Sequence, residues 1–275
     1  MTVITLLCAF PLIYVTMASF ISTRDYAAYG ITFPKHFSLE NYVAILSKGS
    51  KVMQGFWISV YVTVIATVLN LIFTFITSYG ISKKYLPGRV GITFFMYFSM
   101  LFSGGIVPYY LLIVRLGMID SLWSIIVPGL ISPWNCFLMR NFLMALPETI
   151  EESARIDGAN DFVVMARIIL PLSMPVVATI GLFYAVGHWN EWFGAMIFIN
   201  DATKHPLQLV LRNILTINAA VLDPAVAAAK ARIDPPPNEL LKMTALVVTT
   251  VPILVVYPFV QKYFVKGIIA GSIKG

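Results

Sequence analysis

Long apolar runs alternate with short polar segments along this chain. Six runs approach the roughly 20 residues that a helix needs to cross the hydrocarbon core of a bilayer. They cover approximately residues 3–21, 56–81, 91–114, 122–138, 172–193 and 243–260. The pattern predicts an all-α membrane protein in which six transmembrane helices form a single transmembrane domain over residues 1–275. Prolines in or at the ends of these runs predict kinked or broken helices, at Pro108, Pro128, Pro175, Pro252 and Pro258.

Polar side chains recur at steps of three and four along the second run, which places them on one face of a helix. Such a stripe turns away from lipid, because buried hydroxyl and amide groups need hydrogen-bond partners. It either packs against neighbouring helices or lines a polar route, and the sequence leaves both interpretations open. The candidates for a substrate path on this stripe are Ser59, Thr63, Thr67, Asn70 and Thr74.

The fifth run ends in a second polar group. A carboxylate at membrane depth is expensive and indicates function, but tryptophans with polar neighbours also occur where a helix meets the membrane interface. At 1.5 Å per residue, Glu191 lies about 30 Å along a helix that starts at Pro171, near the far boundary. Trp189, Asn190 and Glu191 are therefore further candidates, at the outer mouth of a path.

The composition supports membrane insertion. Hydrophobic residues make up 59% of the 275 positions and charged residues only 12%, whereas about 25% of a soluble domain is charged. The mean hydropathy is +0.83. Cys8 and Cys136 fall inside apolar runs, which favours neither a disulfide nor a metal site. The net charge of +6 fits basic anchors in loops better than nucleic-acid binding, so contact with membrane lipid and not with nucleic acid is expected.

Basic residues in the short loops indicate the orientation. The loop at 82–90 contains Lys83, Lys84 and Arg89, whereas the short loop across the membrane contains Arg115. Because Lys and Arg in short loops favour the cytoplasmic side, both termini are expected in the cytoplasm.

A long external loop then covers about residues 200–242. Asp223-Pro224 is a good helix start and the three prolines at 235–237 end the helix, so a short alanine-rich helix is expected between them. This segment docks a partner, reaches into a pore or caps the bundle.

A charged segment at about residues 147–170 is too polar to cross the membrane. Pro147 suits a first helical position, and acidic residues follow in the first turns, where the helix dipole favours them. Arg155 follows Glu151 by four residues and Glu152 by three, so ion pairs within this helix are expected. Gly158 is a natural helix terminator.

A second helix follows directly. Asn160 is expected to cap it, and its apolar face is predicted to comprise Phe162, Met165, Ile168 and Ile169. The result is a helical hairpin on the cytoplasmic side. Without a partner, such a hairpin would lie on the lipid surface as an amphipathic element.

The spacing within the hairpin is specific. Glu152, Ala154, Gly158, Ile168, Leu170 and Pro171 match the Glu-Ala-Ala…Gly…Ile-x-Leu-Pro signature, with Ser153 replacing the first alanine. The chain resembles the membrane permease subunits of bacterial ATP-binding-cassette importers, and within them the carbohydrate branch that contains the maltose importer's smaller permease. Features along nearly the whole chain agree, among them Phe33-Pro34, Asn41-Tyr42, Arg115-Leu116-Gly117-Met118, Trp189-Asn190-Glu191 and the segment Gln261-Lys262-Tyr263-Phe264-Val265-Lys266-Gly267. The chain is most similar to permeases for complex or acidic polysaccharides, such as the alginate importer.

The resemblance implies the type I importer permease fold, with the hairpin as coupling element in a bacterial inner membrane. The first hairpin helix would enter a groove on a cytoplasmic ATPase subunit. The implied partners are two ATPase subunits, a second permease in a heterodimer, an extracytoplasmic solute-binding protein and an oligosaccharide. This chain lacks a phosphate-binding loop, so ATP and Mg would bind the ATPase subunits and no cofactor would bind here. The implied coupling residues are Glu151, Glu152, Ser153, Ala154, Arg155, Asp157 and Gly158.

Two other classes of protein stay open. An intramembrane enzyme acting on lipid-linked sugars would want paired acids or a metal set, whereas Glu191 stands almost alone. A channel or an ion-coupled carrier would want ligands near the middle of the membrane, where the sequence offers mainly hydroxyls and Asn70. The cargo also stays open. The basic residues of the external loop either bind an acidic oligosaccharide or form ion pairs with nearby aspartates. The basic residues are Lys204, Arg212, Lys230 and Arg232, and the aspartates are Asp201, Asp223 and Asp234.

Overall fold

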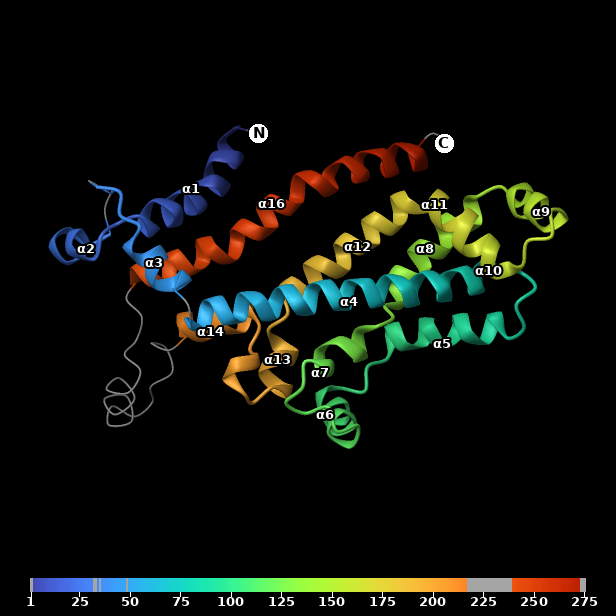
Figure 1. Ribbon diagram of the computed structural model, residues 1–275, viewed down its shortest axis with the longest axis horizontal. Coiled ribbons are helices and arrows are strands. Elements are labelled where there is room, and N and C mark those ends of the chain that lie inside the picture. Colours follow the sequence, from blue (N-terminus) through green and yellow to red (C-terminus); the bar gives the residue numbers. More distant parts are fainter. Residues whose placement is uncertain (1, 32–33, 35, 48, 217–238, 273–275) are drawn as a thin grey trace. The chain divides into compact units, whose positions relative to one another are not determined.

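The computed structural model describes residues 2–31, 34, 36–47, 49–216 and 239–272, and every regular element among them is a helix. Two compact units divide the chain. Unit 1 comprises residues 1–60 and 190–255, and unit 2 comprises residues 61–189 and 256–275. Two long helices contribute to both units, α4 (Lys51–Ser82) and α16 (Glu239–Ser272) (Figure 1).

Unit 2 contains the hairpin and most of the polar stripe. Ser132 begins α8 by accepting a hydrogen bond from the Asn135 N–H, and Pro133 follows it at a position where no N–H is needed. Helix α8 packs against both α5 and α12 (Figure 1). The elements of unit 2, besides its part of α4 and α16, are α5 (Arg89–Leu101), α6 (Ile106–Arg115), α7 (Trp123–Ile126), η1 (Val127–Gly129), α8 (Pro133–Ala145), α9 (Glu148–Ile156), α10 (Asp161–Val163), η2 (Val164–Ile169), α11 (Leu170–Leu172) and α12 (Met174–Trp189).

Three of the predicted runs are broken, so they do not form single straight helices. The run at 91–114 divides into α5 and α6, which meet at 119° across residues 102–105. The run at 122–138 divides into α7, η1 and α8. The fifth run begins at a bend of 80° between residues 161–172 and α12. Prolines predict these breaks only in part, because the first falls at Gly104-Gly105 and α16 runs unbroken through Pro252 and Pro258.

By length and composition, α4 alone among the described helices is long and apolar enough to cross a membrane by itself. Two bent pairs, α5 with α6 and residues 161–172 with α12, also qualify if each pair counts as one span. The described part of the chain therefore contains one to three candidate spans by this measure. The predicted count of six rests on the apolar runs of the sequence.

One apolar core joins the hairpin to the helices of unit 2. It includes side chains from α4, α8, α9, η2 and α12, so burial of a shared surface holds these elements together. Its buried members are Phe75, Tyr79, Met139, Leu143, Ala154, Val164, Ile169, Val176, Ile180 and Tyr184.

Unit 1 has a smaller core of Ala18, Ile21 and Leu240. The buried Asn41 amide donates to the Ile21 carbonyl at 2.9 Å, which ties α3 to the end of α1. Gly55 allows α4 to approach residues 205–210 closely, because a Cβ there would lie only 3.0 Å from Val210 Cγ2. The remaining elements of unit 1 are α1 (Thr2–Ser19), α2 (Thr23–Tyr29), α3 (Glu40–Leu46), α13 (Phe193–Phe198), η3 (Ala202–Lys204) and α14 (Leu207–Thr216).

Candidate functional site

The hairpin consists of α9, a tight turn, and α10 with η2. Pro147 is the N-cap of α9, whereas the sequence predicts it at the first helical position. Gly158 adopts φ +83°, a conformation that side chains disfavour, and its N–H donates to the Arg155 carbonyl at 3.0 Å. The Asn160 side chain accepts from the Val163 N–H at 2.9 Å. The predicted terminator at Gly158 and the predicted cap at Asn160 are therefore confirmed.

The predicted ion pairs within α9 are wrong. Arg155 turns away from Glu151 and Glu152, and instead donates to Asp161 Oδ1 at 2.7 Å and to the Tyr85 hydroxyl at 2.6 Å. Glu151 pairs with Lys83 from the α4–α5 connection. These acids and bases meet across elements because that connection lies against α9. The hairpin is thus tied to the end of α4 by charge as well as by its apolar core.

Two faces of the hairpin differ in exposure. Ala154 is buried in the core of unit 2, whereas Ser153 beside it is exposed and its hydroxyl donates to the Thr149 carbonyl at 2.9 Å. Ile156 is 86% exposed and Phe162 is 71% exposed. Glu152 is exposed as well, and it makes no ion pair with any residue that the structure describes.

The predicted apolar face of the second hairpin helix is wrong at Phe162. Met165, Ile168 and Ile169 pack in the core as predicted, but Val164 is buried with them and Phe162 points outward. The cause is the π-helical geometry of η2, whose wider turns change which residues share a face. A prediction based on 3.6 residues per turn does not anticipate that change.

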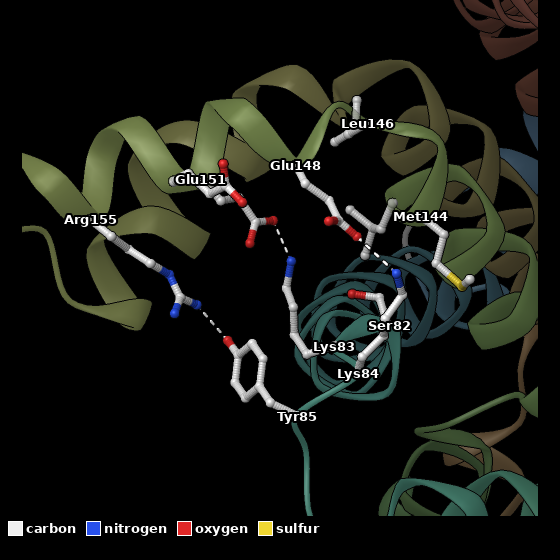
Figure 2. Close-up of a pocket in the computed structure, with 11 residues that line it drawn as sticks. Ser82, Lys83, Lys84, Tyr85, Met144, Leu146, Glu148, Glu151 and Arg155 are labelled. Atoms are coloured by element: carbon white, nitrogen blue, oxygen red, sulfur yellow. Dashed lines mark hydrogen bonds and ion pairs between the residues drawn. The ribbon is translucent and has the colours of Figure 1, made fainter.

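A cavity of about 390 Å³ lies between α9 and the connection that follows α4. Figure 2 shows Lys83 pointing toward Glu151, Lys84 toward Glu148 and Arg155 toward Tyr85. The hydrogen bond to Tyr85 raises the pKa of Arg155 further above its usual range, so this side chain stays cationic. The lining residues are Ser82, Lys83, Lys84, Tyr85, Leu143, Met144, Leu146, Glu148, Glu151, Glu152 and Arg155.

Most of the polar stripe on α4 is engaged in hydrogen bonds within the chain. The Ser59 hydroxyl accepts from the Leu207 N–H at 2.8 Å within unit 1. In unit 2 the Asn70 amide donates to the Gly129 carbonyl at 2.5 Å, and its oxygen lies 3.3 Å from His188 Nε2. The Thr74 and Tyr184 hydroxyls are 2.7 Å apart. Three of the five stripe candidates therefore have structural partners.

Thr63 and Thr67 differ from their neighbours on the stripe. Their hydroxyl oxygens are buried, and neither has a hydrogen-bond partner among the described residues. Native structures rarely leave buried polar groups unpaired, so each such group needs an explanation.

The candidates at the end of α12 also have structural partners. Trp189 is only 7% exposed. The Asn190 side-chain oxygen accepts from Gln208 Nε2 at 3.4 Å. Glu191 accepts from the Gly194 N–H at 2.7 Å, which supports the start of α13 where the helix dipole favours an acid. These contacts explain the polar residues without reference to a ligand.

The basic residues of the external segment are partly accounted for. Lys204 lies 3.6 Å from Asp201, and the Arg212 guanidinium lies 4.8 Å from the centre of the Trp192 ring. The predicted alanine-rich helix, together with Lys230, Arg232, Asp223 and Asp234, lies outside the described residues. Within the described part of the chain, no group of three His, Cys, Asp or Glu could hold a metal ion.

Sequence reasoning missed the partners of the hairpin. The sequence indicates Lys83 and Lys84 only as basic loop residues, and it does not indicate Tyr85 as a partner of Arg155. One sequence feature could have indicated Lys83 and Lys84 as partners of the hairpin. They are two adjacent cations at the end of a predicted span, and the acid-rich helix is predicted on the same side of the membrane. Charge complementarity pairs such segments but does not say which cation meets which acid.

Comparison with known proteins places the chain in a family of transport proteins. Residues 41–270 match the family described as binding-protein-dependent transport system inner membrane component. The polygalacturonan/rhamnogalacturonan transport system permease protein YtcP of Bacillus subtilis is 40% identical over 98% of this chain and 94% of its own length. Protein LplC of the same organism is 41% identical over 96% of this chain and 89% of its own.

A solved structure matches over nearly the same extent. It is a chain from the crystal structure of a bacterial ABC transporter involved in the import of the acidic polysaccharide alginate. The match has a TM-score of 0.84 and 30% sequence identity, and it covers 96% of this chain and 93% of that one. The likeness therefore extends over nearly the whole chain.

Proposed function

Because the chain belongs to the family of binding-protein-dependent transport system inner membrane components, we propose that it is the permease subunit of an ATP-driven importer that moves oligosaccharides into the bacterial cytoplasm. Its relatives are transport subunits and not enzymes. Hydrolysis of ATP, with its Mg, accordingly belongs to partner subunits. The chain lies in the inner membrane as part of an importer complex.

The hairpin is the proposed coupling element, and the observation that carries this is its exposed face. Glu152 and Ser153 are exposed there, and Ile156 and Phe162 present apolar side chains beside them. A short helix with apolar anchors and an exposed acid that pairs with no described residue suits insertion into a groove. Of the seven coupling candidates, Ala154 supports the helix from the core, and Asp157 and Gly158 form its terminating turn.

The complex we propose contains a second permease, two ATPase subunits and an extracytoplasmic solute-binding protein. In this proposal both termini lie in the cytoplasm, because six is an even number of spans and the short loop at 82–90 is basic; the hairpin lies on the same side and residues 200–242 outside. Closure of the ATPase pair moves the hairpins, and rigid-body rocking of the helices then exposes the path alternately to each side. The bent helix pairs in unit 2 support broken spans of the kind that lines a cavity.

The proposed path follows α4 at Thr63 and Thr67. Their buried hydroxyls have no partner in the described structure, and a sugar hydroxyl would supply one. Ser59, Asn70 and Thr74 instead support packing, because each already has a bond within its own unit. Trp189, Asn190 and Glu191 support the end of α12 in the same way.

An acidic oligosaccharide is the proposed cargo. The names of two matching proteins specify polygalacturonan/rhamnogalacturonan and alginate, and a third specifies arabinooligosaccharides. Arg212 over the Trp192 ring combines a cation with an aromatic surface. Such a pair suits a sugar carboxylate. Lys204 is a weaker candidate, because it already forms an ion pair with Asp201.

Reconstitution of the whole complex in vesicles tests the function. With its binding protein and ATP inside, the complex should accumulate uronic-acid oligomers and hydrolyse ATP faster when they are present. Stimulation by neutral oligomers alone would contradict the acidic cargo. Uptake driven by an ion gradient without ATP, or turnover of a lipid-linked sugar by the isolated chain, would contradict the importer itself.

A further inference from the structure

The α4–α5 connection joins the inner side of the hairpin through two sets of contacts, which we call the hairpin clamp. In the first set, Lys83 pairs with Glu151 and its ammonium lies 4.5 Å from the centre of the Tyr79 ring. In the second set, Arg155 bridges Tyr85 and Asp161 through hydrogen bonds of 2.6 and 2.7 Å. Each set joins an element of the hairpin to the residues that directly follow α4 (Figure 2).

Burial distinguishes the first set of the clamp from an ordinary surface ion pair, whereas Arg155 and Asp161 of the second set are 40% and 59% exposed. The Lys83 and Glu151 side chains are only 16% and 17% exposed. The neighbouring pair, Lys84 with Glu148, joins the same two segments at 3.2 Å, but its side chains are 79% and 77% exposed. Breaking a buried pair leaves a charge without compensation, whereas an exposed pair contributes little. Removing one partner should therefore have a larger effect at Lys83–Glu151 than at Lys84–Glu148, although the two pairs join the same segments.

Helix α4 extends the clamp into the membrane segment. It runs unbroken for 32 residues and ends at Ser82, immediately before Lys83. Its inner face carries the bonds from Asn70 to Gly129 and from Thr74 to Tyr184. Lys83 and Tyr85 hold the hairpin to the end of α4, so a displacement of the hairpin would move α4 as well. The hydrogen bonds of Asn70 and Thr74 would then pass this displacement to the broken segment between α7 and α8.

We propose that Lys83 and Tyr85 clamp the hairpin to the end of α4, so that the hairpin and α4 of unit 2 move as one rigid lever. This inference rests on the proposed function. It also divides the coupling candidates: Glu151 and Arg155 act within the chain as positioning residues, while Glu152 and Ser153 face the partner.

Charge reversal in the reconstituted complex tests the clamp. Lys83→Glu and Glu151→Lys alone should each lower the amount of sugar imported per ATP hydrolysed by about tenfold, because each leaves one largely buried charge without its partner. The double reversal should restore the ratio to within about twofold, because it restores the pair. The matched control, Lys84→Glu, should change the ratio by less than about twofold, since that pair is exposed.

A second measurement separates positioning from docking. The single variants should retain their ATPase subunits through purification. Parallel loss of these subunits and of import would assign Glu151 to the ATPase contact and overturn the clamp, as would an unchanged ratio in both single variants. If the unmodified complex shows no ATP-driven uptake, the proposed function fails instead.

Cross-linking covers the case in which charge reversal prevents insertion. In a Cys8→Ser background, Lys83→Cys and Glu151→Cys would be joined by a flexible bis-maleimide, while Cys136 stays buried. A rigid lever predicts that the cross-linked complex keeps at least about half of its uptake, because the joined residues do not separate during the cycle. Arrest of uptake by the cross-link would overturn the inference.

Discussion

The hairpin and the polar stripe of α4 satisfy their polar groups in different ways. On the inner side of the hairpin, Glu151 and Arg155 contact Lys83 and Tyr85 of the α4–α5 connection, and the outer side keeps Glu152, Ile156 and Phe162 exposed. On the stripe, uncharged groups bond to neighbouring backbone and side chains, except that Thr63 and Thr67 have no hydrogen-bond partner among the described residues. In both regions the residues already engaged build the structure. The unengaged residues are where a partner or a substrate is best sought.

Gly158→Pro is the strongest test of the hairpin. Proline requires φ near −65° and has no N–H, whereas Gly158 has φ +83° and donates to the Arg155 carbonyl. The turn should fail, at a cost of about 3 kcal/mol or more. Uptake should fall below a tenth of normal while membrane insertion, measured by immunoblot of the membrane fraction, is preserved. Normal sugar-stimulated ATP hydrolysis in this variant would argue against a coupling role.

Phe162→Asp tests the outer side of the hairpin with a smaller expected effect. A buried interface aromatic contributes about 2 kcal/mol or more, so ATPase subunits should dissociate roughly thirtyfold more readily. Their retention during purification measures this. Val90→Asp is the control, because Val90 of unit 2 is 82% exposed and lies outside both the hairpin and the cavity beside α9. Equal loss of ATPase subunits in both variants would mean that the outer side has no special part in docking.

Tyr184→Phe tests the engaged part of the stripe. The Tyr184 hydroxyl meets Thr74 at 2.7 Å and accepts from the Ser132 N–H at 3.1 Å, so its removal leaves buried groups unpaired. Each lost partner costs about 1–3 kcal/mol. The thermal midpoint of the purified complex should drop, while its ATPase subunits remain bound. An unchanged midpoint would show that these bonds contribute little to stability.

The pattern of the sequence predicts the helical class and the turn of the hairpin, because both depend on local chemistry. Apolar runs require helices in lipid, and Gly158 and Asn160 act within a few residues of their own positions. The pairing of Lys83 with Glu151 is different, because 68 residues separate the two partners. By charge alone, Arg155 could pair with Glu151 or Glu152 of its own helix. Tertiary packing instead brings it into contact with Asp161 and Tyr85.

The breaks in the helices show a second limit of sequence reasoning. Prolines mark positions that can break, but Gly104-Gly105 breaks a run while Pro252 and Pro258 do not interrupt α16. Whether a break is stable depends on partners for the freed backbone groups. Asn70 and Tyr184 supply such partners at Gly129 and Ser132 from two other helices. Because η2 has π-helical turns, Phe162 lies on a different face from Ile169 and is exposed. A period of 3.6 residues predicts that both share one face.

Thr67→Val has the smallest expected effect on stability and the most selective effect on transport. Valine preserves the shape of threonine and removes a buried hydroxyl that has no partner among the described residues. The thermal midpoint should therefore stay constant or rise slightly, in contrast to Tyr184→Phe, because no bond is lost. If Thr67 meets the sugar, the concentration for half-maximal uptake should increase about threefold to tenfold, in line with one hydrogen bond of about 1 kcal/mol. A lower thermal midpoint with unchanged uptake would place Thr67 among the packing residues and leave the path to other residues.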